Sequence, residues 1–248
     1  KTNMKKLIFI FCAFGLTFNS CSSDDSTDDT GDPDTVLLKS TTETYEDGVF
    51  VTNYTYADNK LVGISYSGGD SEVFNYTNNL LTSIKEYIDG ELDTEIELEY
   101  DSNNRLVTET FMYDFGPGEV NTYTYNADGT VTMLEAGVNT YIYTYDALGN
   151  RIAEEDVNGN QDYVYTYDTK NNPFKNIHQS EVLELMGHST YKNNVLTYVN
   201  TDGVSSDISD AYTSSYSYNN ADYPTSSTIT YVPGTDFEEA IFVELSYY

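Results

Sequence analysis

The chain has 248 residues, with 41 Asp and Glu against 11 Lys and Arg, and a formal net charge of −30. A surface of this charge repels phosphates and anionic headgroups, so we expect no nucleic acid partner and no peripheral binding to lipid. The length suits one large domain, and no shift in composition divides residues 36–248.

Residues 1–20 have the features of a signal peptide of the lipoprotein type. Lys5 and Lys6 form a positive region, and the apolar run over residues 7–16 is too short to span a bilayer. Cys21 follows directly, and it has no disulfide partner once Cys12 is removed with the signal. We predict that Cys21 is the mature N-terminus and carries lipid. The alternative is a plain secreted protein with a stray cysteine.

Residues 22–35 contain six aspartates and no hydrophobic residue. Such a segment cannot bury apolar surface, so residues 21–35 are expected to form a disordered, acidic tether. An acidic run after a lipidated cysteine also resembles the export signal of Bacteroidota surface lipoproteins. The expected location is therefore the outer membrane, lipid-anchored, at the cell surface.

Residues 141–168 contain the clearest repeat. Tyr-Ile-Tyr-Thr-Tyr-Asp at 141–146 returns as Tyr-Val-Tyr-Thr-Tyr-Asp at 163–168, 22 residues later. A return at fixed spacing indicates one supersecondary unit used repeatedly. Tyrosine alternates with β-branched residues, which is the period of a strand, and Gly149-Asn150 and Asn158-Gly159 are typical of tight turns.

Weaker copies of this phrase extend along the chain. Their last tyrosines are Tyr56, Tyr76, Tyr100, Tyr125, Tyr145, Tyr167, Tyr191, Tyr218 and Tyr247, at spacings of 20–29 residues. Because the connections are short, neighbouring strands must be antiparallel. The sequence predicts an all-β fold: residues 36–248 form one antiparallel meander of repeated strand pairs, roughly 16–18 strands in a curved or rolled sheet.

The repeat pattern is interrupted between Phe174 and Lys192. Residues 180–186 read as one short helix, with Ser180 as its N-cap and Gly187 beyond its C-terminus. Its apolar residues are expected to lie against the sheet and plug one end. We expect at most this one short helix.

The motif Tyr-Asp-Ala-Leu-Gly-Asn-Arg-Ile, followed by Asp-Val-Asn-Gly-Asn and Tyr-Thr-Tyr-Asp, resembles the YD repeat of rearrangement-hotspot (RHS) proteins. The match is close over residues 141–168 and loose over residues 45–248. The layout is similar to the Tyr- and Asn-rich repeat lipoproteins of Bacteroidota. The resemblance implies a secreted β-repeat, in a chain too short to enclose another protein.

The residue types used in catalysis and metal binding form no recognisable set. His178 and His188 have no cysteine beside them, and the loop from Asp156 to Asp162 lacks the Gly and Glu that a calcium loop needs. No nucleophile elbow or phosphate loop is present. We therefore expect no enzyme, no metal, no cofactor and no catalytic residue.

Tyrosine remains as the candidate binding residue, with 25 copies and no Trp. One interpretation is that the rings build the core. The other is that one ladder faces solvent and holds a ligand, in which case Tyr143, Tyr145, Tyr165 and Tyr167 are the candidates.

The favoured function is a non-enzymatic envelope lipoprotein, a binding or scaffold module whose partner is a glycan or an outer-membrane protein. It would contact the membrane only through its N-terminal lipid. The first alternative is a carboxylate-based enzyme acting on polysaccharide. A transmembrane barrel is a further alternative, although strands of five to seven residues fall short of the roughly 9–11 that cross a bilayer.

Overall fold

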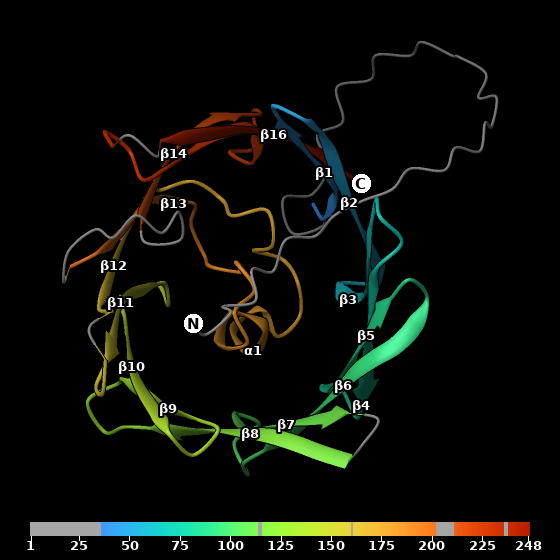
Figure 1. Ribbon diagram of the computed structural model, residues 1–248, viewed down its shortest axis with the longest axis vertical. Coiled ribbons are helices and arrows are strands. Elements are labelled where there is room, and N and C mark those ends of the chain that lie inside the picture. The colour runs from blue at the N-terminus through green and yellow to red at the C-terminus, as the bar shows by residue number, and fades with distance from the viewer. Residues whose placement is uncertain (1–35, 114–115, 160, 202–210, 236–237) are drawn as a thin grey trace, which may run out of the picture.

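A computed structural model describes residues 36–113, 116–159, 161–201, 211–235 and 238–248. The strands form a ring around a short helix (Figure 1). Cys21, the proposed signal and the proposed tether lie outside the described residues.

The strands are β1 (Leu38–Tyr45), β2 (Gly48–Ala57), β3 (Lys60–Tyr66), β4 (Ser71–Thr77), β5 (Leu80–Ile88), β6 (Glu91–Tyr100), β7 (Leu106–Tyr113), β8 (Gly116–Tyr125), β9 (Val131–Glu135), β10 (Asn139–Tyr145), β11 (Arg151–Asp156), β12 (Tyr163–Tyr167), β13 (Val195–Asn200), β14 (Ala211–Tyr218), β15 (Pro224–Tyr231) and β16 (Glu239–Tyr247). The helix, α1 (Ser180–Leu185), comes between β12 and β13 in the chain.

The strands pair in chain order, and β1 pairs with β16 to close the barrel. At this seam Thr41 of β1 lies opposite Thr52 of β2 on one side and Leu245 of β16 on the other. Every pairing is antiparallel, as short hairpin connections require. The predicted antiparallel meander is confirmed over the described strands. The sheet does not stay open as a curved or rolled sheet, because it closes completely.

β-bulges explain why the sheet closes. The pairing register shifts at the last tyrosine of six repeats: Tyr56, Tyr76, Tyr100, Tyr145, Tyr167 and Tyr218. A bulge bends its strand and increases the local twist. Repeated around the sheet at one end of the strands, this bend favours closure, which also leaves no exposed strand edge.

The residue after this tyrosine organises the turn. Its side-chain oxygen accepts two backbone N–H groups of the turn, in the pairs Asp101 with Asn103 and Arg105, Asp146 with Leu148 and Asn150, and Asn219 with Ala221 and Tyr223. The side chain thus satisfies backbone donors that a tight turn would leave unpaired. This accounts for the Tyr-Asp and Tyr-Asn pairs that mark the repeat.

The two faces of the barrel wall differ in polarity. In β6, Thr94, Ile96 and Leu98 are buried, whereas Glu97 and Glu99 are exposed. The same alternation continues along other strands and places the core residues and most tyrosine side chains inside, whereas Val73, Val164 and Phe242 are exposed. The core therefore lies within the ring, and much of the outer face is polar.

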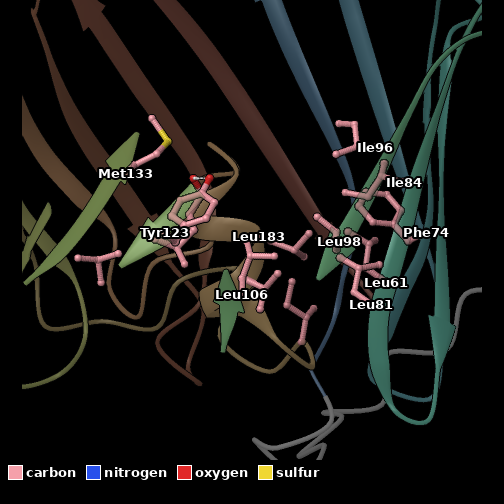
Figure 2. Packing of buried hydrophobic residues seen from close by; sticks show 14 of the residues in the cluster. Leu61, Phe74, Leu81, Ile84, Ile96, Leu98, Leu106, Tyr123, Met133 and Leu183 are labelled. Atoms are coloured by element: carbon pink, nitrogen blue, oxygen red, sulfur yellow. Dashed lines mark hydrogen bonds between the residues drawn. The ribbon is translucent and has the colours of Figure 1, made fainter. Parts of the chain in front are cut away.

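The helix α1 lies inside the barrel and fills part of it (Figure 1). Leu183 is fully buried and packs among wall residues such as Leu106 and Tyr123 (Figure 2). Gly187 has a φ of 91° just past the helix, and its N–H donates to Glu184 O, as expected of a C-terminal glycine. No helix in the described residues is long and apolar enough to cross a membrane.

The prediction of Ser180 as N-cap is wrong by one residue. Gln179 occupies the cap in a left-handed conformation, with φ 58° and ψ 37°, and makes no side-chain capping bond. Its Oε1 instead accepts the backbone N–H of Leu81 in β5 at 2.7 Å. The side chain of Gln179 therefore bonds to the barrel wall and does not cap the helix.

The segment around α1 is fixed to the turns at one end of the barrel. His178 donates its backbone N–H to Asn59 O at 2.8 Å, and its ring Nε2 lies 2.7 Å from Asn79 O. Asn176 Nδ2 donates to Val36 O at 2.9 Å. These bonds hold the segment to the turn after β2, to the turn after β4 and to the residue that precedes β1 by two positions.

Candidate functional site

A cavity of about 440 Å³ lies between the barrel wall and the C-terminal end of α1. Three carboxylates line it, from Glu109 of β7, Glu135 of β9 and Glu154 of β11, together with Arg151. The aromatic lining consists of Phe111 and six tyrosines: Tyr123, Tyr141, Tyr143, Tyr163, Tyr165 and Tyr191. We refer to this space as the tyrosine cavity. Its volume is at the small end of the range for ligand sites, roughly 300–1,000 Å³.

Arg151 joins the cavity wall to the helix. Its Nε lies 2.6 Å from Oε1 of Glu184 in α1, and its Nη1 lies 3.1 Å from Oε2 of Glu154. Its Nη2 donates to the backbone carbonyl of Glu184 at 3.0 Å. The guanidinium also lies over the ring of Tyr143, 3.8 Å from the ring centroid. Arg151 therefore makes two contacts with the helix and two with the wall.

Arg151 stays charged although it is buried, because the carboxylates of Glu184 and Glu154 lie beside it. Burial disfavours the guanidinium charge, but the carboxylate of Glu184 raises the pKa of Arg151 above its ordinary value. Burial in turn raises the pKa of Glu184, and Arg151 opposes that rise. Tyr145 supports the pair by donating its hydroxyl to Oε2 of Glu184 at 3.1 Å.

Glu109 is the most deeply buried carboxylate of the tyrosine cavity, with 3% of its surface exposed. Its Oε1 accepts the hydroxyl of Tyr123 at 2.7 Å, and its Oε2 accepts Nδ2 of Asn121 at 3.1 Å. Burial raises its pKa, while these two hydrogen bonds act in the opposite direction. Glu109 therefore holds a proton at a higher pH than an ordinary glutamate does.

The four tyrosines predicted as ligand candidates all lie on the inner side of the wall. Tyr143 and Tyr165 are buried, and both line the tyrosine cavity. Tyr145 and Tyr167 are half-buried; Tyr145 bonds Glu184, and Tyr167 donates its hydroxyl to Arg151 O at 2.5 Å. These rings therefore do not form a ladder on the outer face. Replacing Tyr143 or Tyr165 would disturb the core as well as any ligand.

The remaining candidates from the sequence have structural surroundings. His178 contacts a turn, and the ring of His188 lies 6.0 Å from that of Phe74. Asp156 Oδ1 accepts the N–H groups of Asn158 and Gly159, so that loop is a turn, as predicted. Within the described ranges, no group of three or more His, Cys, Asp or Glu is placed to hold a metal ion.

Sequence reasoning gave no site role to Glu109, Arg151, Tyr163 or Tyr191. The signal for Arg151 was present, because it completes the Gly149-Asn150-Arg151 turn of the best repeat. No sequence motif around Glu109 distinguishes it from the other acidic residues, which number 41 in all. Only the closed barrel brings these residues together.

A second cavity of about 410 Å³ borders another part of α1. Leu106, Val131 and Val182 contribute apolar surface, and Arg105 lies over the ring of Tyr125, 4.4 Å from its centroid. Lys192 and Glu181 add charges of both signs. It has fewer aromatic rings than the tyrosine cavity, which is therefore the better candidate.

Comparison with solved structures finds distant likenesses. No family model matches the chain, and no curated protein matches it. A porin-like protein from Bacteroides uniformis ATCC 8492 aligns with 86% of this chain and 85% of its own, at 13% identity and a TM-score of 0.40. The TcdB2-TccC3-Cdc42 structure aligns with 78% of this chain and 10% of its own, at 15% identity and a TM-score of 0.30. Likenesses at these scores do not extend to function.

Proposed function

We propose that this chain is a non-enzymatic binding module of the cell envelope, held at the outer membrane surface by lipid on Cys21, and that its tyrosine cavity takes a glycan. The observation that carries the proposal is the lining of that cavity. Six tyrosine rings offer flat apolar faces, and three carboxylates offer hydrogen-bond acceptors. Sugars present both a C–H face and a rim of hydroxyl donors, so they suit aromatic rings set among acceptors.

The outer face supports a barrel that stands in water and is tethered to the membrane. Glu97 and Glu99 of β6 and Thr122 and Thr124 of β8 are exposed on that face. A transmembrane barrel has the opposite arrangement, with an apolar band outside and a polar interior. Apolar residues such as Val73, Val164 and Phe242 are exposed as well, so the choice of the lipid-anchored alternative rests on the charged and hydroxyl side chains among them.

The test is binding of oligosaccharides to the purified mature protein, measured by calorimetry. Tyr141 is a suitable probe because it lines the cavity, is only half-buried, and bonds Glu135 through its hydroxyl. Tyr141→Ala should weaken binding of the retained sugar at least tenfold. Tyr45→Ala is the matched control, since Tyr45 is also half-buried and also bonds a glutamate, but lies outside the cavity. Equal loss in both variants would count against this site.

An enzyme remains the second candidate because two unlike carboxylates line one cavity. Burial raises the pKa of Glu109, and Glu154 accepts a hydrogen bond from Nη1 of Arg151. Two carboxyl groups in one site, one of them with a raised pKa, are what glycoside hydrolysis uses. Turnover of a polysaccharide by the purified protein, abolished by Glu109→Gln, would replace the binding proposal with this one.

A further inference from the structure

The tyrosine cavity offers a ligand more hydrogen-bond acceptors than donors. Three tyrosine hydroxyls are already donated to its three carboxylates: Tyr123 to Glu109, Tyr165 to Glu154, and Tyr141 to Glu135. A hydroxyl has one proton to give. Once that proton is used, these tyrosines can only accept, as the carboxylates do. The side-chain amides of Asn121 and Gln161 also line the cavity and can donate, but a ligand that contacts the carboxylates and these three tyrosines must bring donors.

The charge of the cavity is also one-sided. Its lining holds three acidic side chains and one basic one, Arg151. The guanidinium is already paired with Glu184 and Glu154 and stacked on Tyr143. An anionic ligand in this cavity would lie beside carboxylates, and the lining has no unpaired cation to balance its charge. Anionic sugars are therefore disfavoured.

One acceptor is open to a ligand. Both hydrogen bonds that Glu154 accepts, from Nη1 of Arg151 and from the hydroxyl of Tyr165, reach its Oε2. No hydrogen bond from a described residue reaches its Oε1, and the side chain of Glu154 is 18% exposed. Around it stand aromatic rings, whose faces attract cations.

We propose that the tyrosine cavity is selective for a ligand that bears a protonated amine, such as an amino sugar. An ammonium group has three donors and no acceptor, which complements this lining. Its charge is balanced by the carboxylates and favoured by the rings. The inference rests on the proposed function in that it specifies the class of glycan, but the cavity's preference for an amine stands apart from its preference for a sugar.

The experiment compares matched ligands on the mature protein by calorimetry at pH 6, where an amine is protonated. The probes are glucosamine, N-acetylglucosamine, glucuronate and the plain diamine putrescine. Glucosamine should bind on the order of tenfold tighter than its acetylated form, because acetylation removes the charge-assisted hydrogen bond. Glucuronate should bind most weakly of the sugars.

The variant Glu135→Gln tests the source of the selectivity. Glu135 is half-buried at the edge of the wall, so its replacement spares the buried core. It should weaken the binding of glucosamine several-fold more than the binding of N-acetylglucosamine, so the preference between the two sugars should fall. Glu43→Gln is the control, because Glu43 also accepts a tyrosine hydroxyl and lies away from the cavity.

The outcomes separate the two proposals. Equal affinity for glucosamine and N-acetylglucosamine, or tighter binding of glucuronate, overturns the amine inference and leaves the glycan module standing. Binding of putrescine without any sugar supports the amine inference and overturns the glycan proposal. If neither glucosamine nor putrescine binds, the amine inference is wrong.

Discussion

Arg151 carries its charge inside the barrel because two carboxylates and a carbonyl oxygen face it. Removing one partner of a buried ion pair costs more than the pair itself contributes, since the other charge is left uncompensated. Among the described residues, the loss would leave the buried carboxylate of Glu184 with Tyr145 as its donor. Both contacts that Arg151 makes with α1 would be lost at the same time.

Arg151→Met should therefore lower the free energy of unfolding by about 3–5 kcal/mol. Urea denaturation of the mature protein measures this. Adding Glu184→Leu to Arg151→Met should recover part of the loss, because no buried charge then remains unpaired. Arg105→Met is the control: Arg105 also stacks on a tyrosine and pairs with an aspartate, but its side chain is 45% exposed. A similar effect of both single changes would contradict this account.

The repeat pattern identified the turn that contains Arg151 but not the role of the side chain. Its main partner, Glu184, lies 33 residues further along, in the segment where the repeat breaks off. A sequence repeat shows only what successive units have in common. The contact between Arg151 and Glu184 joins one repeat unit to the helical segment that interrupts the repeats. The same limit applies to the tyrosines. Their alternation was readable, but which face turned inward depended on closure of the sheet.

At the scale of elements, α1 is short for a helix that holds a barrel. A six-residue helix is not stable alone, so its packing must maintain it. Val182, Leu183 and Leu185 supply that packing, each less than 10% exposed. The sequence indicated this helix through its apolar residues and Gly187. It did not indicate Gln179 as the cap, because the partner of that side chain is the backbone of β5.

Leu183→Ala should lower the free energy of unfolding by about 2–5 kcal/mol, the cost of a cavity at a fully buried leucine. Glu181→Ala, an exposed change in the same helix, should alter it by less than about 0.5 kcal/mol. Thermal or urea unfolding compares the two. If Leu183→Ala proved neutral, α1 would not be a structural plug.

At the scale of the whole molecule, burial raises the pKa of most interior tyrosines. The pKa reaches about 12 for Tyr76, Tyr125, Tyr191 and Tyr216. An unfolded tyrosine titrates near pH 10. The folded barrel therefore keeps the stability that these residues contribute below pH 10 and loses it as pH rises through the folded values.

We expect the tyrosines to ionise together with unfolding, in one cooperative step above pH 10. Near-ultraviolet absorbance of tyrosinate and far-ultraviolet circular dichroism, followed in one titration, should change in parallel. The chain in concentrated urea provides the comparison and should titrate gradually near pH 10. Gradual ionisation with an intact β-sheet spectrum would show that the rings are accessible.

Anchoring is also a property of the whole molecule. Cys21→Ala should move the protein from the membrane fraction to the soluble fraction, because the lipid is its proposed attachment. Cys12→Ala, within the proposed signal, should leave the partition unchanged. Fractionation followed by immunoblotting distinguishes them. Continued membrane association of the Cys21 variant would mean that another surface holds the protein.

The closure of the sheet into a barrel could not be predicted from the sequence repeat. Strand number and direction followed from the spacing of tyrosines and the short turns. The bulges at tyrosines such as Tyr56 and Tyr145 left no mark of their own, because a bulge inserts no special residue type here. The bend that these bulges add favours a closed barrel over an open sheet.

The pairing of β1 with β16 makes the chain a ring in which the position of the break is arbitrary. The N–H of Tyr248 donates to Leu37 O at 3.0 Å, so the two ends of the barrel segment already touch. A circular permutant that joins residue 248 to residue 36 by a short linker and opens at the exposed turn between Asp89 and Gly90 should therefore refold to the same barrel. Circular dichroism and urea unfolding would test this. A break inside β6, between Ile96 and Glu97, should prevent folding, because it divides a paired strand instead of a loop.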